Sequence, residues 1–315
     1  METNNSSLSP SYQEIFQEIG RQLSLRKKIL AKRTLLIVWP FLLLIIIFYF
    51  FGQKYNLNPF SSNGLSFYSV GYLVAVVLAV IYSSIIRFIF SIEKRIWIDS
   101  FFDKKNLEPA QSWRIARTLF WPAFVLRFKI CLSYYLIPTV LFIVIFIIGT
   151  QAIAVVGIQG NSQLLLIIIS ILLAALIGFI AYGYYLKTKL RYTWFIFLDK
   201  WGANYSYPTF LAEMKKLNEV SKSETFKKSL LANVGTDSIN SIAKLAIDSI
   251  SFGLEQLGGQ VAADIIRVYG NEASRQATDL ANISAQYVLY RFALKEVSGG
   301  EQEVNDNVYN LAQRL

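Results

Sequence analysis

Four long apolar runs constrain this chain more than any other feature of its sequence. They cover about residues 35–52, 67–86, 130–149 and 164–186. Each approaches the roughly 20 apolar residues that a helix needs to cross a bilayer. A backbone inside lipid must satisfy its own hydrogen bonds, which favours helices. The sequence therefore predicts an all-α, polytopic helical membrane protein with four transmembrane helices.

The charges are few and unevenly placed. Charged residues make up only 17% of the chain and hydrophobic residues 54%. Residues 1–204 contain 20 basic and 8 acidic side chains, whereas residues 205–315 contain 11 and 13. The net charge of +10 therefore belongs to the segments that flank the apolar runs. This distribution predicts contact with anionic lipid headgroups and argues against a nucleic-acid partner.

The flanking charges also predict an orientation. Basic residues cluster before the first run, between the second and third runs, and after the fourth, while the other two connections contain only Lys54. Because basic loops stay in the cytoplasm, both termini are expected there, in a plasma or inner membrane. The chain then divides into a cytoplasmic N-terminal helix (1–33), a membrane domain (34–207) with an interfacial segment (87–129), and a cytoplasmic helical tail (208–315).

Aromatic and basic side chains mark the predicted membrane interface. The stretch 112–129 alternates arginines with aromatic residues, which is typical of a helix lying in the headgroup region. Indole rings also prefer that region. The residues expected at the interface are Trp97, Trp113, Arg114, Arg117, Trp121, Trp194 and Trp201.

An internal repeat of about 99 residues relates the two halves of the membrane domain. Pro10, Pro109 and Pro208 are each 99 residues apart, and each opens a helix-like segment. Two tandem hairpin units are predicted, with a partial third copy that starts at Pro208 and lacks a hairpin. The alternative is that apolar sequence aligns with itself by chance. The offset also relates small residues at four-residue spacing, which predicts helix-packing faces at Gly71, Ala75, Ala79 and Ser83 and at Ser170, Ala174 and Gly178.

The tail has helical periodicity. A narrow apolar stripe runs through it at steps of three and four residues, and the pair Gly258 and Gly259 is expected to split it into two helices. Residues 236–297 are expected to bind a protein partner, another copy of the chain or the juxtamembrane helices, and the alternative is a self-contained bundle. The stripe consists of Ile239, Ile242, Ala246, Ile250, Leu254, Leu257, Val261, Ile265 and Val268.

Several kinds of chemistry are excluded by composition. The chain has no histidine and one cysteine, Cys131, so it has neither a histidine-dependent triad nor an intramolecular disulfide. Cys131 is expected to be an inert, buried thiol. No phosphate-binding loop or metal motif is present, so no cofactor is expected. Asp103 and Asp199 remain as polar candidates that would hold Mg²⁺ or act on a lipid, and the competing interpretation is an interfacial anchor.

Three classes of function remain open. The favoured one is a non-enzymatic membrane scaffold or assembly protein whose tail binds partners or oligomerises. The second is a subunit of a transporter or channel, although the apolar runs contain no ionisable residue between their ends. The third is a lipid-modifying enzyme that uses the two interfacial carboxylates.

Overall fold

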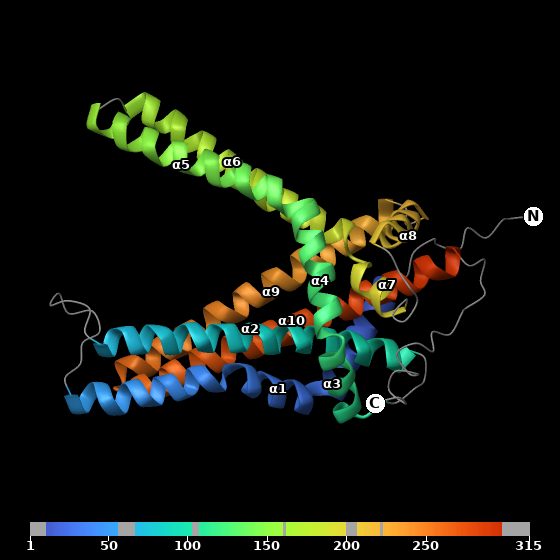
Figure 1. Ribbon diagram of the computed structural model, residues 1–315, viewed down its shortest axis with the longest axis horizontal. Helices are drawn as coiled ribbons and strands as arrows, with labels where there is room; N and C mark the ends of the chain where they lie inside the picture. Colours follow the sequence, from blue (N-terminus) through green and yellow to red (C-terminus); the bar gives the residue numbers. More distant parts are fainter. Residues whose placement is uncertain are drawn as a thin grey trace, which may run out of the picture.

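The computed structural model describes residues 11–55, 67–102, 107–159, 162–199, 207–220 and 223–297, and every regular element in these ranges is helical. Figure 1 shows three long helical hairpins whose tips point toward the same end of the molecule, joined at the other end by short helices. We call that other end the base. The hairpins are α1–α2, α5–α6 and α9–α10.

The helices have the following bounds. The first hairpin consists of α1 (Tyr12–Tyr55) and α2 (Phe67–Phe102), and the second of α5 (Leu136–Gln159) and α6 (Ser162–Lys189). The third consists of α9 (Ser223–Gln256) and α10 (Gln260–Val297). The base contains α3 (Pro109–Thr118), α4 (Phe120–Ile130), the π-helical turn η1 (Cys131–Tyr135), α7 (Thr193–Asp199) and α8 (Tyr207–Val220).

Four stretches of the described chain are long and apolar enough to cross a membrane, as the sequence predicts. They overlap the four apolar runs over most of their length, and most of their large apolar side chains face outward. Only lipid or a similarly apolar medium stabilises so much exposed apolar surface. The stretches are Tyr12–Phe50, Gly71–Ser100, Phe120–Gly157 and Ser162–Asp199.

The first hairpin begins with a capped helix, and small residues bring its two helices together farther along. Ser11 and Glu14 exchange side-chain and backbone hydrogen bonds and thereby cap the start of α1. Farther along, Ser83 lies on α2 facing α1 and donates a hydrogen bond to the carbonyl of Ile37 at 2.7 Å. Ala79, one turn away, is also buried. The two helices approach closely at this point because these side chains are small.

The second hairpin uses other contacts than the predicted small face. The rings of Phe142 and Phe179 stack at 4.5 Å, and Leu172 packs directly over Gly149. Along the other helix edge, the small side chains Ser170, Ala174 and Gly178 are exposed, and nothing lies within 4 Å of a Cβ built on Gly178. Ser170 bonds only within its own helix, to the carbonyl of Leu166 at 2.8 Å, and the described chain does not use these three positions to pack α6 against α5.

The third hairpin turns at the predicted glycine pair. Gly258 has a φ of 80°, in the left-handed region that favours glycine. Its N–H bonds to the carbonyl of Glu255, and the N–H of Gly259 bonds to the carbonyl of Leu254. This bonding pattern satisfies the last carbonyls of α9 and ends the helix. The two helices on either side of this turn are those that the glycine pair predicts.

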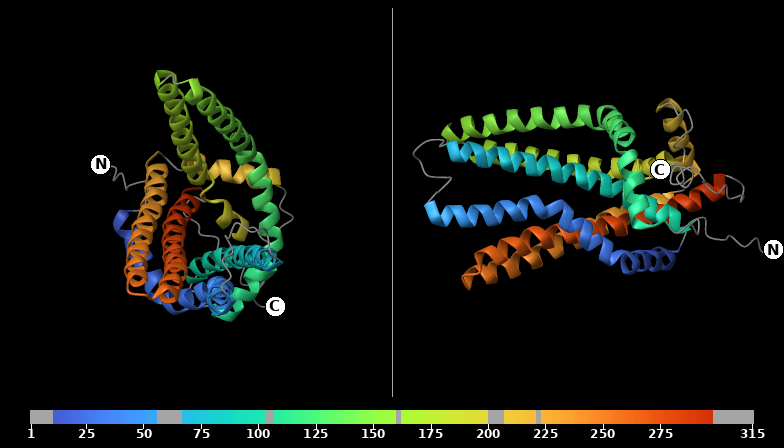
Figure 2. Two further views of the ribbon diagram at one scale, coloured as in Figure 1. Left: turned by 90° about the vertical axis from the view of Figure 1, so that its left-hand side faces the viewer. Right: turned by 60° about the horizontal axis from the view of Figure 1, so that its bottom comes forward.

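The third hairpin does not stand apart as a separate tail. Figures 1 and 2 show α10 running alongside α1 and α2. Tyr49 donates a hydrogen bond to Gln260 near the tips, and Arg87 forms an ion pair with Glu272 closer to the base. At the base, α10 contributes Leu280, Ile283, Tyr287 and Tyr290 to the main core, together with Phe90, Trp97, Tyr192 and Phe195. Within the described chain, α10 thus packs against α1 and α2, and binding of a separate partner or of a second copy stays a prediction.

Candidate anion-binding cavity

A cavity of about 880 Å³ lies where the three hairpins meet the base. Its walls come from α2, from α4 and the π-helical turn, from α6 and α7, and from α9 and α10. Every hairpin therefore supplies part of the lining. Cys131 lies at this cavity and is exposed, which corrects the expectation of a buried thiol.

Basic side chains dominate the charged lining. Six basic residues and only two acidic ones, Asp237 and Asp279, border the cavity. A cleft lined by such an excess of positive charge attracts anions. The basic residues are Arg87, Arg95, Arg127, Lys187, Arg191 and Arg275.

Two of the six cations are neutralised by ion pairs. Arg87 donates two hydrogen bonds to the carboxylate of Glu272, at 2.9 and 2.7 Å. Lys187 donates to Asp237 at 3.0 Å. Both carboxylates lie on the third hairpin, so these pairs also connect it to the other two hairpins.

Asp279, the second acidic residue of the lining, forms an ion pair with Lys94, which does not line the cavity. Lys94 is fully buried, and it also donates a hydrogen bond to Gln276 at 2.9 Å. Desolvation at the junction tends to raise the pKa of Asp279, but Lys94 and Arg95 outweigh that effect and hold the pKa below its ordinary value. Asp279 therefore stays charged and compensates Lys94.

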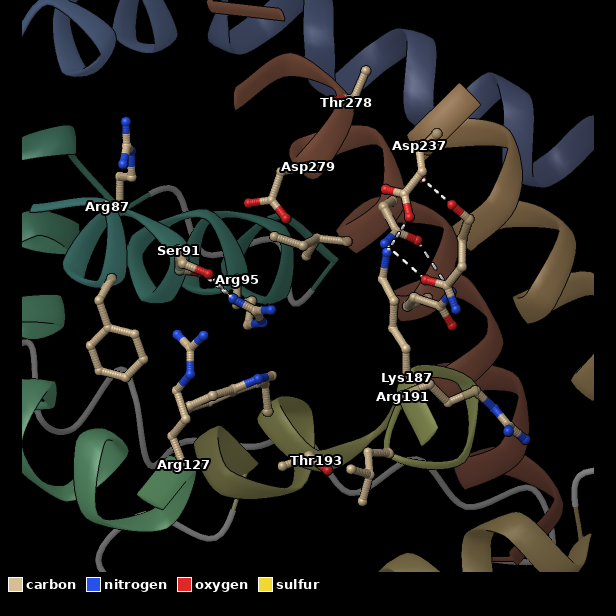
Figure 3. Close-up of a pocket in the computed structure, with 18 of the residues that line it drawn as sticks. Arg87, Ser91, Arg95, Arg127, Lys187, Arg191, Thr193, Asp237, Thr278 and Asp279 are labelled. Atoms are coloured by element: carbon tan, nitrogen blue, oxygen red, sulfur yellow. Dashed lines mark hydrogen bonds and ion pairs between the residues drawn. The ribbon is translucent and has the colours of Figure 1, made fainter. Parts of the chain in front are cut away.

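Arg95 and Arg127 lie close together in the lining; Arg127 is exposed, whereas Arg95 is partly buried. Figure 3 shows their guanidinium groups extending toward one another from α2 and α4. Arg95 stacks 5.3 Å from the ring of Trp194, and Arg127 lies 5.4 Å from the ring of Phe88. Arg95 donates hydrogen bonds to the carbonyl and the hydroxyl of Ser91, both at 2.6 Å, and interacts electrostatically with Asp279 without a contact within 4 Å among the described residues. Two like charges that face each other favour an anion between them.

Arg191 adds a buried cation to the same cavity. Only 7% of the residue is exposed, and its Nε has no hydrogen-bond partner among the described residues. One terminal nitrogen donates to the carbonyl of Thr188 at 2.9 Å, and the guanidinium lies 4.4 Å from the ring of Tyr192. An unsatisfied donor of this kind is costly unless a ligand or water binds it.

Uncharged polar groups complete the wall formed by the third hairpin. Asn282 donates to Asn233 at 3.0 Å, and Asn233 donates to Thr188 at 3.2 Å. Gln286 belongs to the same network because it donates to Asn282 at 3.3 Å. This chain of amides fixes the polar wall, and it supplies donors and acceptors next to the arginines.

The polar candidates of the sequence analysis lie elsewhere. Asp103 falls outside the described residues. Asp199 accepts a hydrogen bond from Tyr290, and Asp99, which the sequence analysis did not single out, accepts one from Tyr287 at 2.7 Å. Both tyrosines are buried in the core of the base. The two aspartates therefore belong to a tyrosine–carboxylate cluster of the core.

This cluster predicts how stability responds to alkaline pH. Burial raises the pKa of Tyr287 and Tyr290 well above the ordinary value, and the adjacent aspartates raise it further. Above about pH 10 the unfolded chain loses these protons while the folded chain retains them, so stability falls as pH rises. Tyr287→Phe should lower the melting temperature at pH 7, because Asp99 loses a donor at a cost of about 1–3 kcal/mol. It should also make the decline above pH 10 shallower, and an unchanged slope would contradict the role of this phenol.

The residues expected at the membrane interface occupy two environments. Trp121 is 66% exposed and stacks on Phe124, and Arg114 and Arg117 are exposed as well. In contrast, Trp97 is completely buried and donates a hydrogen bond to Ser112. Trp97 therefore packs in the protein core. Trp113 and Trp194 are half-buried under Arg33 and Arg95, and Trp201 lies outside the described residues.

The sequence analysis did not identify the cavity. It interpreted Arg87, Arg95 and Arg127 as loop charges that orient the membrane domain. A weaker signal was present in α9, where Ser229, Asn233, Thr236 and Asn240 recur at steps of four, three and four residues. This spacing places polar side chains on one helix face, and the structure turns that face inward.

The described residues show no group of three or more cysteine, aspartate or glutamate side chains that could hold a metal ion. The cavity thus offers arginines and amides, which suit an oxyanion such as a phosphate or a carboxylate. No protein-family model, curated protein sequence or solved structure matches this chain.

Proposed function

We propose that this protein is a non-enzymatic integral membrane scaffold that binds the anionic headgroup of a membrane lipid in the cavity between its hairpins. A phosphate group held by Arg95 and Arg127 would tie α2 to α4, and α9 and α10 form the opposite wall. The bound lipid would thereby stabilise the arrangement of all three hairpins.

The proposed orientation places the base and both termini in the cytoplasm. Basic residues concentrate at the base, whereas Lys54 is the one basic residue in the connections at the two apolar tips. The second apolar run ends at Arg87, which borders the cavity, so the cavity would lie at the depth of the inner headgroups. The exposed Trp121 and Phe124 of α4 support the same depth.

The pair of facing arginines, Arg95 and Arg127, carries this proposal. A bidentate guanidinium suits a phosphate oxygen pair better than a lysine does. A lipid is the favoured source because α2, α4 and the π-helical turn, which line the cavity, belong to apolar stretches of the chain. A free phosphate compound has the same charged chemistry and is separated from a lipid by the experiment below.

A transport function is the second candidate. The polar wall of the cavity continues toward the hairpin tips between α9 and α10, where Asn271 donates to Asp248 at 3.3 Å and Arg267 pairs with Glu255 at 2.8 Å. Polar and charged side chains along a membrane hairpin are the groups with which a transporter lines its path. In the lipid-enzyme alternative, Asp199 would have to act while it accepts the hydrogen bond of Tyr290.

The proposal predicts a lipid-specific stabilisation. The full-length protein, purified in a mild non-ionic detergent, should melt at a higher temperature with added phosphatidylglycerol than with phosphatidylcholine or inorganic phosphate. A ligand at 100 times its Kd stabilises a protein by about 2.7 kcal/mol. The double variant Arg95→Gln/Arg127→Gln should lose most of this rise, whatever its own starting stability.

The double variant Arg114→Gln/Arg117→Gln is the matched control. These two arginines are exposed on α3 and do not line the cavity, so the rise should persist. Equal rises in both double variants would contradict a lipid site at Arg95 and Arg127. A rise with inorganic phosphate as large as the rise with lipid would identify a soluble ligand instead.

A further inference from the structure

The helix α9 has an inverted polarity. Its side toward α10 and the cavity buries polar side chains, including Ser229, Asn233 and Ser251, each at most 1% exposed. Its outer side carries apolar side chains that are 57% to 85% exposed. These are Leu231, Ile239, Ile242, Leu245, Ile250 and Phe252, with Leu257 just beyond the end of the helix.

A helix surrounded by water has the opposite arrangement, because burying apolar surface is the main source of its packing energy. Apolar groups outside and polar groups inside are stable where the surroundings are hydrocarbon. The outer side of α9 therefore matches a lipid environment. The exposed sides of α5 and α6 have the same character.

The contacts of α10 place this hairpin beside the first membrane hairpin. Gln260 binds Tyr49 at the tip end, and Glu272 binds Arg87 at the end of the second apolar run. The part of α10 between them runs alongside apolar α1 and α2, and α9 is its hairpin partner. Figures 1 and 2 show the turn of α9–α10 near the tip of the α1–α2 hairpin.

The length of α9 brings its tip close to the far interface. From Asn240 at the cavity to Gln256 at the tip, the helix rises about 24 Å at 1.5 Å per residue. A bilayer core is about 30 Å thick. The hairpin therefore covers most of this thickness, and its turn lies beside Tyr49, near the end of the first apolar run.

Most charged side chains of the α9–α10 hairpin within residues 240–272 form ion pairs, which lowers the cost of placing them within a membrane. Arg267 forms ion pairs with Asp248, Glu255 and Asp264. Asn240 on α9 accepts a hydrogen bond from Ser274 on α10, which sets the register of the two helices. Lys244, one turn farther along α9, is therefore near the level of Glu272. Its long side chain can extend toward the base. Paired charges turned toward the protein are the usual form in which ionisable groups occur inside membranes.

We propose that α9–α10 is a third membrane-inserted hairpin, with the outer side of α9 in contact with lipid acyl chains. Its polar content leaves it below the hydropathy of the four apolar stretches. The stretch 240–272 then belongs to the membrane domain, and the cytoplasmic tail begins again farther along α10. The proposal does not require the cavity to bind a lipid.

Cysteine labelling of the full chain in intact cells tests the proposal. In a Cys131→Ser background, single cysteines replace Lys227 at the base, Gln163 at the start of α6, and Gln256 at the tip of α9; these three residues are exposed. A membrane-impermeant maleimide should modify Gln256→Cys from the same side as Gln163→Cys and from the opposite side to Lys227→Cys. The comparison holds in either orientation of the protein. Modification of Gln256→Cys from the side of Lys227→Cys, or in detergent alone, would overturn the proposal.

A spin label at Ile250→Cys, in the same background, separates lipid from other occupants. In liposomes, contact with acyl chains gives high collision rates with oxygen and low rates with a water-soluble nickel chelate. High nickel accessibility would show that water covers this side. Low accessibility to both reagents would show that a protein surface, such as a second copy of the chain, covers it. Either of the last two results would overturn the assignment to lipid.

Discussion

Replacement of Arg33 by methionine should destabilise the protein by about 3–5 kcal/mol, because it leaves a buried carboxylate without its cation. Arg33 on α1 donates two hydrogen bonds to Glu93 on α2, at 3.0 and 2.9 Å, and Glu93 is fully buried. Ser112 on α3 donates to the same carboxylate and accepts from Trp97. A single substitution therefore disrupts the contact among three helices at the base. A melting curve of the full-length variant in mild detergent gives the measurement.

The double variant Arg33→Met/Glu93→Met is the control. Removal of both charges takes away the uncompensated carboxylate, so the double variant should be clearly more stable than Arg33→Met alone. If both variants were equally unstable, the loss would come from the stacking of Arg33 on Trp113 at 4.0 Å. A melting temperature of Arg33→Met close to that of the unmodified protein would contradict the structural importance of the pair.

Ile250→Arg should be the most disruptive change on the outer side of α9. Ile250 is 59% exposed and lies one turn closer to the tip than Ile247, which packs beside Gly270. If the hairpin lies in the membrane, this position is near the middle of the hydrocarbon layer. An arginine at that depth costs about 3 kcal/mol relative to an apolar residue. The melting temperature in lipid nanodiscs should therefore fall markedly.

Ile239→Arg provides a matched comparison on the same helix. Ile239 is 60% exposed, but it lies next to Asn240 at the level of the base, where an arginine reaches the headgroups. This variant should retain most of its stability. Equal, small effects of Ile239→Arg and Ile250→Arg would show that the outer side of α9 is in water.

The apolar helices could be predicted because their signal is local. A run of about 20 apolar residues defines a membrane helix without reference to the rest of the chain. The break at Gly258 is local in the same sense, since only glycine readily adopts the left-handed conformation found there. Both features follow from the sequence itself.

The position of the third hairpin could not be predicted, because its signals are long-range. Lys94 and Asp279 meet across 185 positions of the chain, and nothing near either residue indicates the other. Sequence periodicity showed that Ile239, Ile242 and Ile250 share one face of a helix. It did not show whether that face turns toward the protein or away from it. In the structure this face points away from the protein, so an apolar environment outside the protein has to cover it.

The cavity illustrates the same limit. The arginines at 87, 95 and 127 are correctly placed at one end of the apolar runs by the positive-inside pattern. Their convergence depends on the break between α3 and α4 at Leu119 and on the path of α10, which the sequence does not specify. Trp97 is of a residue type that is common at membrane interfaces, but Arg26 of α1 and Ser112 of α3 contact it in the fold.

Native mass spectrometry of the full-length protein, extracted gently from its own membrane, tests the central claim most directly. The unmodified protein should retain an anionic phospholipid, and Arg95→Gln/Arg127→Gln should lose it while Arg114→Gln/Arg117→Gln keeps it. Equal retention of the same lipids by all three proteins, or release of every lipid from the unmodified protein, would contradict a headgroup site at the junction of the hairpins.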